Sequence, residues 1–345
     1  MTGTTAAGQP REWCLNWPSS QGSRLGRALL KATPDTFFVD EDLGLPGFPA
    51  LGSASAGGVT GQGEHLCLRL QKQGDNTDYV ARELAGLAGC QHQDVGYCGM
   101  KDRHAVTRQW FSLYLPGNEA NDARLLASIA NNWPVLAAHR HPRKLRRGDH
   151  RGNFFRIALQ QVSGDVEAID AALRRIAITG CPNYYGHQRF GRAGYNLDRA
   201  IHMNPNRGKG RNRRQSGRNQ QGLYFSAARS WLFNQVLAAR VAAGTWQQPL
   251  PGEGEAGYPT GPLWGDGGTL ATGTAEQFER DVAGAWPEVL RVFSATRMKP
   301  ERRALVLHPV DLSWRWEGDD LLELQFGLAP GQYATALIED VFELI

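Results

Sequence analysis

The sequence lacks both long apolar runs and paired cysteines. No stretch reaches the roughly 18 uncharged apolar residues that a membrane helix needs, and the first residues lack the basic start and apolar run of a signal peptide. The five cysteines are widely spaced and form no CxxC pair, which disfavours a disulfide scaffold or a zinc ribbon. The sequence therefore favours a globular protein of the reducing cytoplasm over secreted, membrane or collagen-like classes.

The usual signs of a bound cofactor are missing as well. No βαβ series carries a Gly-rich phosphate loop, and no cluster of metal ligands has a recognisable spacing. Alternating apolar residues predict strands at 65–70, 110–115, 155–159 and 322–328. Because the middle of the chain is more helical and irregular, this pattern predicts an α+β protein with a mostly antiparallel sheet and an inserted second domain. A length of 345 residues also suggests about two domains.

Acidic residues are nearly absent from two segments. Residues 139–151 hold six Arg or Lys and one Asp, and residues 207–218 hold six and no acid. The two segments contribute +11 to a chain of net charge +4, so the rest carries about −7. Solvated basic loops are the plain alternative, but two such runs in an otherwise acidic chain indicate a polyanion, here nucleic acid. The residues expected to contact phosphates are Arg143, Lys144, Arg146, Arg147, Arg213 and Arg214.

The densest polar cluster is GMKDRHAVTRQW at 99–110. Asp102 stands there between Lys101 and Arg103, and nearby cations favour an ionised carboxylate. The alternative is a turn aspartate that hydrogen-bonds its own backbone. His104 has no visible partner, so its spacing is more typical of a surface or packing histidine.

The same cluster resembles the GxKDxxAxTxQ signature of the tRNA pseudouridine synthase D (TruD) family. Further segments resemble that family's motifs in the same order, namely LLKATPDTFFVDE (29–41), GEHLCLRLQKQGDNT (63–77), KLRRGDHRGNFF (144–155), PNYYGHQRFG (182–191), SAARSWLFNQ (226–235) and PGQYAT (330–335). The resemblance covers nearly the whole chain.

The resemblance implies a role for individual residues. Asp102 takes the place of the catalytic aspartate. The expected substrate-binding residues are Phe37, Asn153, Phe155, Tyr333, Lys31 and Lys101. The aromatic members and Asn153 would line the pocket of a flipped uracil, and the two lysines would add positive potential near a phosphate. By pattern alone, the aromatic residues are more typical of core positions and Asn153 of a turn.

The implied activity is the conversion of uridine to pseudouridine in tRNA, expected at position 13 of the D arm. This isomerisation breaks the C1′–N1 bond and joins C1′ to C5, so it needs an ionised carboxylate and a dry pocket but no cofactor or metal. Attack at C1′, attack at C6 and a glycal route all remain open. So do a non-catalytic RNA binder and RNA substrates other than tRNA. A glycosidase is disfavoured because no second carboxylate has a convincing spacing.

The resemblance also implies a domain plan. It predicts a flexible lead-in at 1–19, a pseudouridine-synthase domain at 20–180 plus 300–345, a family-specific insert at 181–299, and a monomer. The chain departs from the family pattern at Asp35-Thr36, in a longer Gly-rich segment at 46–62, and at Glu339-Asp340, where Arg-Glu is common. We expect any role of that arginine to be lost or supplied elsewhere.

Overall fold

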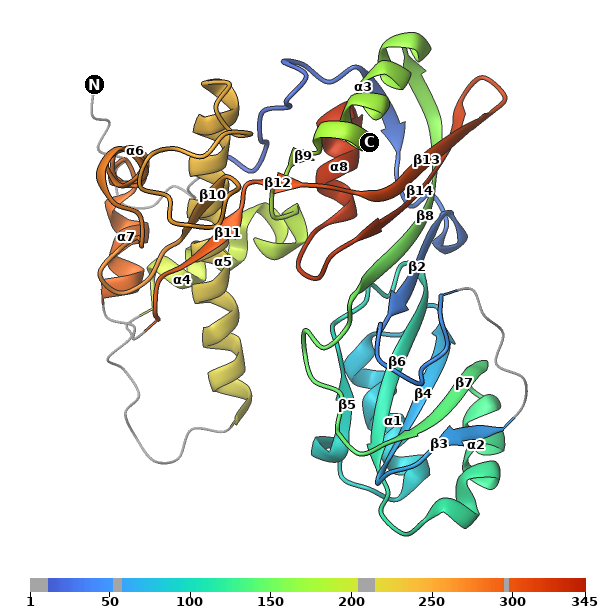
Figure 1. Cartoon of the computed structure of the whole chain (residues 1–345). Coiled ribbons are helices and arrows are strands. Elements are labelled where there is room, and N and C mark those ends of the chain that lie inside the picture. Colours follow the sequence, from blue (N-terminus) through green and yellow to red (C-terminus); the bar gives the residue numbers. More distant parts are fainter. Residues whose placement is uncertain (1–11, 52–57, 204–214, 295–297) are drawn as a thin grey trace. The chain divides into compact units, whose positions relative to one another are not determined.

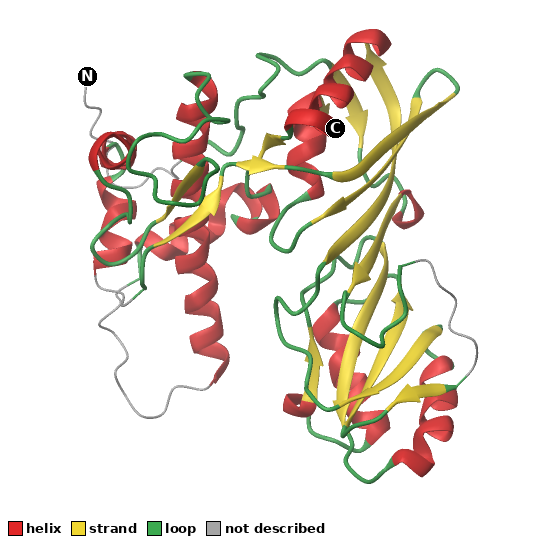
Figure 2. Ribbon diagram, in the orientation of Figure 1, coloured by secondary structure: helices red, strands yellow, loops and turns green. Residues whose placement is uncertain are grey.

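The computed structural model describes residues 12–51, 58–203, 215–294 and 298–345. The chain forms two compact units, each built from several stretches of sequence. The first unit comprises Met1–Leu25, Ala171–His308 and Gln332–Val341, and the second comprises Gly26–Asp170, Pro309–Gly331 and Phe342–Ile345. Helices and strands are present in both units (Figure 2). Every helix within the described ranges is too short or too polar to cross a membrane.

The second unit is built on one mixed sheet. Its described strands are β1 (Gly26–Leu29), β2 (Phe37–Asp42), β3 (Val59–Gly61), β4 (His65–Lys72), β5 (Val95–Tyr97), β6 (Val106–Tyr114), β7 (Val135–His141), β8 (Gly152–Gly164), β13 (Val310–Glu317), β14 (Leu321–Leu328) and β15 (Phe342–Leu344). The order is β13-β14-β8-β2-β6-β4-β7-β3, with β5 beside β6 and β1 pairing with β8 and β15. Only the pairs β1–β15, β2–β6 and β3–β7 run parallel among these strands. The predicted mixed, mostly antiparallel α+β fold is confirmed.

Two helices cover one face of this sheet (Figure 1). Helix α1 (Thr77–Ala88) begins after Asn76, whose Oδ1 accepts a hydrogen bond from the Tyr79 amide, and it ends at Gly89 in the left-handed region (φ +67°). The sequence predicts both ends, with Asn76 or Thr77 as the cap and Gly89 as the stop of a helix. The apolar sides of α1 and of α2 (Asp122–Ala130) bury leucines of β4 and β6, which fixes the face that each strand turns inward.

The first unit is mainly helical. Its elements are β9 (Cys181–Pro182), α4 (Tyr195–Ile201), α5 (Gln215–Ala242), β10 (Thr260–Leu263), α6 (Gly273–Gly284), α7 (Pro287–Ser294), β11 (Glu301–Ala304), β12 (Val306–Leu307) and α8 (Ala334–Val341). Strand β10 pairs with β11, and β9 with β12. Helix α3 (Val166–Thr179) contributes to both units. Single 3-10 turns occur at Pro34–Thr36, His92–Asp94, Glu119–Asn121, His187–Arg189 and Arg192–Gly194.

Several local predictions differ from the structure. The apolar run SAARSWLFNQVLAARV predicts a helix capped by Ser226, but α5 begins eleven residues earlier, at Gln215. The segment TALIEDVFELI predicts a helix at the end of the sequence, but α8 ends at Val341 and Phe342–Leu344 forms β15 beside β1, where Phe342 is fully buried. Val166, expected to face inward, is 44% exposed in the first turn of α3.

Residues 12–25 pack within the first unit, although residues 12–19 belong to the segment predicted as a flexible lead-in; residues 1–11 of that segment lie outside the described residues. Trp13 and Trp17 are 6% and 5% exposed, and the Trp13 Nε1 donates to Asp198 Oδ1 at 2.8 Å. Ser20 donates to the Asp340 carboxylate through its amide (2.7 Å) and its hydroxyl (2.6 Å). Burial of two large aromatic rings holds this segment in place despite its low content of secondary structure.

Candidate active site

The structure brings most predicted site residues together in the second unit. These are Lys31, Phe37, Lys101, Asp102, Asn153 and Phe155. Tyr333 belongs to the first unit, and Arg213 and Arg214 lie outside the described residues.

The register of β2 and β8 turns the pocket residues to one face of the sheet. Asn153 lies opposite Glu41, Phe155 opposite Val39, and Ile157 opposite Phe37. Directly opposed residues point to the same face, and so do residues two apart on one strand. Phe37 therefore shares a face with Asn153 and Phe155, which lie more than a hundred positions later in the sequence.

The segment that carries Asp102 joins β5 to β6 and is held by a buried polar network. Thr77, at the start of α1, accepts a hydrogen bond from the Lys101 amide at 2.9 Å and donates to Gln109 Oε1 at 3.0 Å. The Gln109 amide nitrogen in turn donates to the Gly99 carbonyl at 2.6 Å. Thr77 and Gln109 are completely buried, so the network fixes the backbone on the N-terminal side of Asp102.

Lys101 is part of this framework. Its Nζ lies 2.5 Å from Glu41 Oε2, and the two side chains are 7% and 0% exposed. The other Glu41 oxygen accepts from the Trp110 amide at 3.1 Å. Because Glu41 neutralises its charge inside the protein, the structure favours a bracing role for Lys101 over the predicted contribution to potential near a phosphate.

Asp102 pairs with Lys31, through a short contact between Oδ2 and Nζ. Its Oδ1 accepts a hydrogen bond from the His104 amide at 2.9 Å. Burial alone would raise the pKa of Asp102, but the hydrogen bonds from Lys31 and His104 and the charge of Lys31 outweigh it, so the pKa lies below its ordinary value. The carboxylate is therefore ionised at neutral pH and remains partly accessible, at 24% exposure.

The predicted source of this ionisation was wrong. Lys101 is paired with Glu41, and Arg103 Nε donates to His104 Nε2 at 2.9 Å. The effective cation is Lys31, which precedes β2 and has a left-handed backbone (φ +62°), a conformation that is uncommon for lysine. Its Nζ also lies 4.4 Å from the centroid of the Phe37 ring, so one cation lies against both the carboxylate and the aromatic group.

The aromatic residues form a continuous cluster. The rings of Phe37 and Phe155 meet edge to face with centroids 6.2 Å apart, and Phe155 stacks on Phe326 at 5.5 Å. Phe37 and Phe155 are only 5% and 8% exposed. Phe326 of β14 lies opposite Phe155 and was not predicted; the alternation in 322–328 was the available signal. This cluster forms an apolar wall next to Lys31.

Asn153 carries an unsatisfied buried atom. Its Oδ1 has no hydrogen-bond partner among the described residues, while its amide nitrogen lies 3.4 Å from His150 Nε2. A buried acceptor without a partner lowers the stability of a fold, and a bound ligand often supplies the missing hydrogen bond. The N3–H of a uracil ring is a donor of the required kind.

Lys72 is a site residue that the sequence did not reveal. It lies opposite Thr107, which lies opposite Val39, so Lys72 shares the face of Phe155. It is 2% exposed, and its Nζ donates to the Asp75 carbonyl at 2.8 Å. Burial lowers the pKa of Lys72 to about 8, although the charges of Asp75 and Asp102 oppose the shift. A lysine that ends a buried strand was the only signal in the sequence.

Tyr333 and Glu339 lie in the first unit. The Tyr333 ring is 5.7 Å from that of Tyr185, and burial raises the pKa of its hydroxyl. Its predicted contact with the target base stays a prediction. Glu339, which stands where the family commonly has Arg, lies 3.3 Å from His187 Nε2. The hydrogen bond to Glu339 raises the pKa of His187, so this pair supplies a carboxylate–imidazole contact at that position.

Comparisons of this chain with family models, curated proteins and solved structures all find matches of one description. A family model described as tRNA pseudouridine synthase D (TruD) matches residues 22–198. A protein of Marinobacter nauticus named tRNA pseudouridine synthase D is 57% identical over 342 residues, with 96% of each chain covered. One of the same name from Ectopseudomonas mendocina is 40% identical, with 95% of each covered. A crystal structure from Methanosarcina mazei, described as tRNA pseudouridine synthase D, is similar in fold with a TM-score of 0.63 at 18% identity, and covers 95% of this chain and 96% of its own.

Proposed function

The chain belongs to the tRNA pseudouridine synthase D family, and on that premise we propose that it isomerises uridine to pseudouridine in tRNA, with Asp102 as the catalytic nucleophile. The observation that carries this proposal is the placement of Asp102. An ionised carboxylate, held by Lys31, stands beside a buried aromatic wall and shares the unit of an unsatisfied Asn153 oxygen.

Each of these features serves one requirement of the reaction. Cleavage of the C1′–N1 bond and formation of the C1′–C5 bond need a carboxylate that is ionised and not fully buried. The uracil must leave its stack and enter a dry site, which Phe37 and Phe155 can wall. Asn153 Oδ1 can accept the N3–H of the extruded uracil and hold the ring while it turns.

Lys31 has a further part in this proposal. It keeps the pKa of Asp102 low in the free protein and lies against the Phe37 ring. A sugar phosphate that enters the site is negatively charged, and Lys31 can form an ion pair with it while it stays paired with Asp102. We also propose Tyr333, a residue of the first unit, as a contact of the target base.

We propose position 13 of the D arm as the target. Enzyme is incubated with an unmodified tRNA transcript, and the product is mapped by carbodiimide labelling and primer extension. A matched transcript with cytidine at position 13 is the control. A single stop at position 13, absent from the control, supports the proposal; binding without any product contradicts it and favours an RNA binder.

The setting proposed for this reaction is the reducing cytoplasm, where tRNA is found, with the protein acting as a monomer. All five cysteines are free thiols in the structure. Gel filtration with light scattering on the purified chain tests the oligomeric state, and a dimer mass contradicts this part of the proposal.

A further inference from the structure

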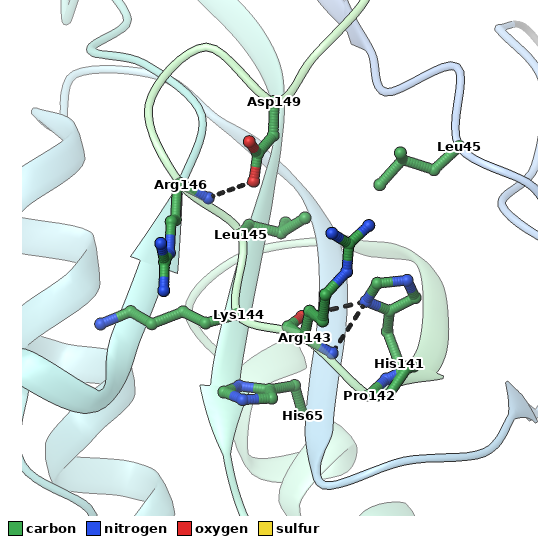
Figure 3. A pocket seen from close by; sticks show the side chains of 9 residues that line it. All are labelled: Leu45, His65, His141, Pro142, Arg143, Lys144, Leu145, Arg146 and Asp149. Carbon is green, nitrogen blue, oxygen red and sulfur yellow. Dashed lines mark hydrogen bonds between the residues drawn. The ribbon is translucent and has the colours of Figure 1, made fainter.

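A basic cavity lies in the second unit, at the end of β4 away from Asp102. Its volume is about 510 Å³, within the usual range for ligand sites. Its lining residues are Leu45, His65, His141, Pro142, Arg143, Lys144, Leu145, Arg146 and Asp149 (Figure 3). Lys72, near Asp102, and His65 are the last and first residues of β4, so a rise of about 3.4 Å per residue separates them by about 24 Å.

The backbone that carries the basic side chains is rigidly held. Leu145 is 2% exposed, and its amide donates to Ser112 Oγ at 3.0 Å. The Arg146 amide donates to Asp149 Oδ2 at 2.7 Å, which closes a tight turn. The side chains of Arg143 and Arg146 remain exposed. A site of this kind loses little conformational entropy when it binds an anion.

Two histidines face each other in the wall. His65 and His141 are directly opposed on β4 and β7. His65 is 8% exposed, and its Nδ1 has no hydrogen-bond partner among the described residues. His141 Nδ1 lies 3.2 Å from the Arg143 amide and 3.0 Å from the Arg143 carbonyl, so the backbone of Arg143 fixes the orientation of the His141 ring.

The charges around His65 decide its protonation. Burial lowers the pKa of His65, as do Lys144 and His141, while Glu64 and Asp94 oppose the shift. Tyr114 on β6 packs against the same ring at 5.0 Å. Three permanent cations and one carboxylate line the cavity, so an added proton is unfavourable until an anion enters.

We propose that this cavity binds a phosphate of the tRNA backbone several nucleotides away from the target uridine, and that His65 takes up a proton when the phosphate binds. The inference rests on the proposed function for the identity of the RNA. A second hollow of about 330 Å³ shares Lys144, Leu145 and Arg146 and continues to Arg147. Residues 143–147 therefore line two adjoining hollows of this unit, the cavity and its neighbour.

The test measures the affinity of the full-length chain for an unmodified tRNA transcript by fluorescence anisotropy, between pH 6 and pH 8 and at several salt concentrations. Arg143→Gln/Arg146→Gln is compared with Arg124→Gln/Arg175→Gln, which removes the same charge from exposed positions on α2 and α3. We expect the first pair to weaken binding about tenfold more than the control, and to lower the salt slope by about 0.7–0.9 for each phosphate that the protein no longer neutralises.

The pH dependence of tRNA binding tests the proton uptake by His65. Binding to the unaltered protein should tighten as the pH falls from 8 to 6, by at most about tenfold per pH unit for each proton taken up. His65→Gln should reduce this dependence. If His65→Gln does not fold, as judged by circular dichroism, His65→Asn provides the same test.

The outcomes separate this inference from the proposed function. Equal affinity of the pocket variant and the charge-matched control contradicts the pocket. Equal pH dependence in the folded histidine variants and the unaltered protein contradicts the proton uptake. If the unaltered protein forms no pseudouridine in any transcript, the proposed function fails, whatever the binding data show.

Discussion

The pKa of Asp102 lies below its ordinary value because Lys31 and the His104 amide together outweigh the effect of burial. Desolvation acts to protonate the carboxyl group, while Lys31 and the His104 amide stabilise its charged form. Lys31 is 71 positions away in sequence and reaches Asp102 from the segment before β2. Charge at the reacting group therefore depends on tertiary structure, and removal of Lys31 changes both the pKa of Asp102 and the charge of the site.

Replacing Lys31 by Met should shift the acid limb of the kcat/KM profile to higher pH. Without the cation the pKa of Asp102 rises, so the carboxylate is lost at a higher pH as the solution is acidified. We also expect kcat at neutral pH to fall by about tenfold or more. The measurement is pseudouridine formation between pH 4.5 and 8. Lys31→Arg keeps the charge and should preserve the limb; an unshifted limb in Lys31→Met contradicts the role of Lys31.

Replacing Asn153 by Ala should lower kcat/KM by about tenfold or more, the usual effect of one lost hydrogen bond to substrate. The free energy of unfolding should change little, because Asn153 Oδ1 has no protein partner to lose among the described residues. Steady-state kinetics and urea unfolding are measured on the same preparation. Unchanged kinetics, or a loss of activity that merely follows a loss of stability, contradicts base recognition by Asn153.

The sequence was sufficient to single out Asp102 but not its partners. The resemblance to the TruD family predicts Asp102, Lys31 and Asn153 as site residues, and their roles stay predictions. The sequence motifs do not show that Lys101 is neutralised by Glu41, since that ion pair depends on how β2 lies against β6. Lys72 was missed for the same reason, because its position near Asp102 follows from strand register.

Among the elements, the start of α1 and the strand β6 hold the Asp102 segment. Thr77 bonds to Lys101 and to Gln109, and Gln109 bonds to Gly99. These groups are buried, so each loses water and depends on its protein partner. The geometry of the Asp102 segment thus depends on the fully buried hydroxyl of Thr77.

Replacing Thr77 by Val should cost about 1–3 kcal/mol of unfolding free energy, because the Lys101 amide and Gln109 lose a buried partner. The matched control is Thr107→Val: Thr107 is equally buried, but its hydroxyl has no partner among the described residues, so its removal should be neutral or stabilising. Urea unfolding of both variants gives the comparison. Equal stability changes contradict the proposed bracing network.

Helices and strands with a regular spacing of apolar residues were predictable, and those that depend on contacts distant in sequence were not. The strands β4, β6, β8 and β14 follow alternation of apolar residues, and α1 follows its cap and its glycine stop. By contrast, residues 342–344 continue a helical pattern but form β15, because a free edge of β1 is available to them. Pairing with a strand more than 300 positions away overrides local propensity.

At the scale of the whole molecule, positive charge is concentrated in two segments, and the rest of the chain is mildly acidic. Arg143, Lys144, Arg146 and Arg147 lie in the loop between β7 and β8 of the second unit, whereas Arg140 lies on β7 and pairs with Asp122. The basic residues of 207–214 lie outside the described residues. The domain boundaries predicted at 20–180, 181–299 and 300–345 stay a prediction. Burial of Trp13 and Trp17 was not predictable from composition, because a Gly- and Pro-containing segment shows no periodic signal.

Neutralising Arg143, Arg146, Arg213 and Arg214 together should weaken tRNA binding and flatten its salt dependence, since fewer counterions are then released from the RNA. The affinity is measured between 50 and 300 mM salt, with an equal number of exposed arginines replaced elsewhere as the control. An affinity and slope equal to those of the unaltered protein contradict the assignment of these arginines to phosphates.

The central claim is that Asp102 performs the chemistry, and it is tested most directly by Asp102→Asn. The substitution removes the charge with little change in shape, and Asp35→Asn, at an exposed position before β2, is the control. Pseudouridine formation on an unmodified tRNA transcript is measured under single-turnover conditions, together with tRNA affinity. We predict no detectable product from Asp102→Asn, tRNA binding within a few-fold of the unaltered protein, and normal activity for Asp35→Asn. Product formed by Asp102→Asn at the rate of the unaltered protein would contradict the account.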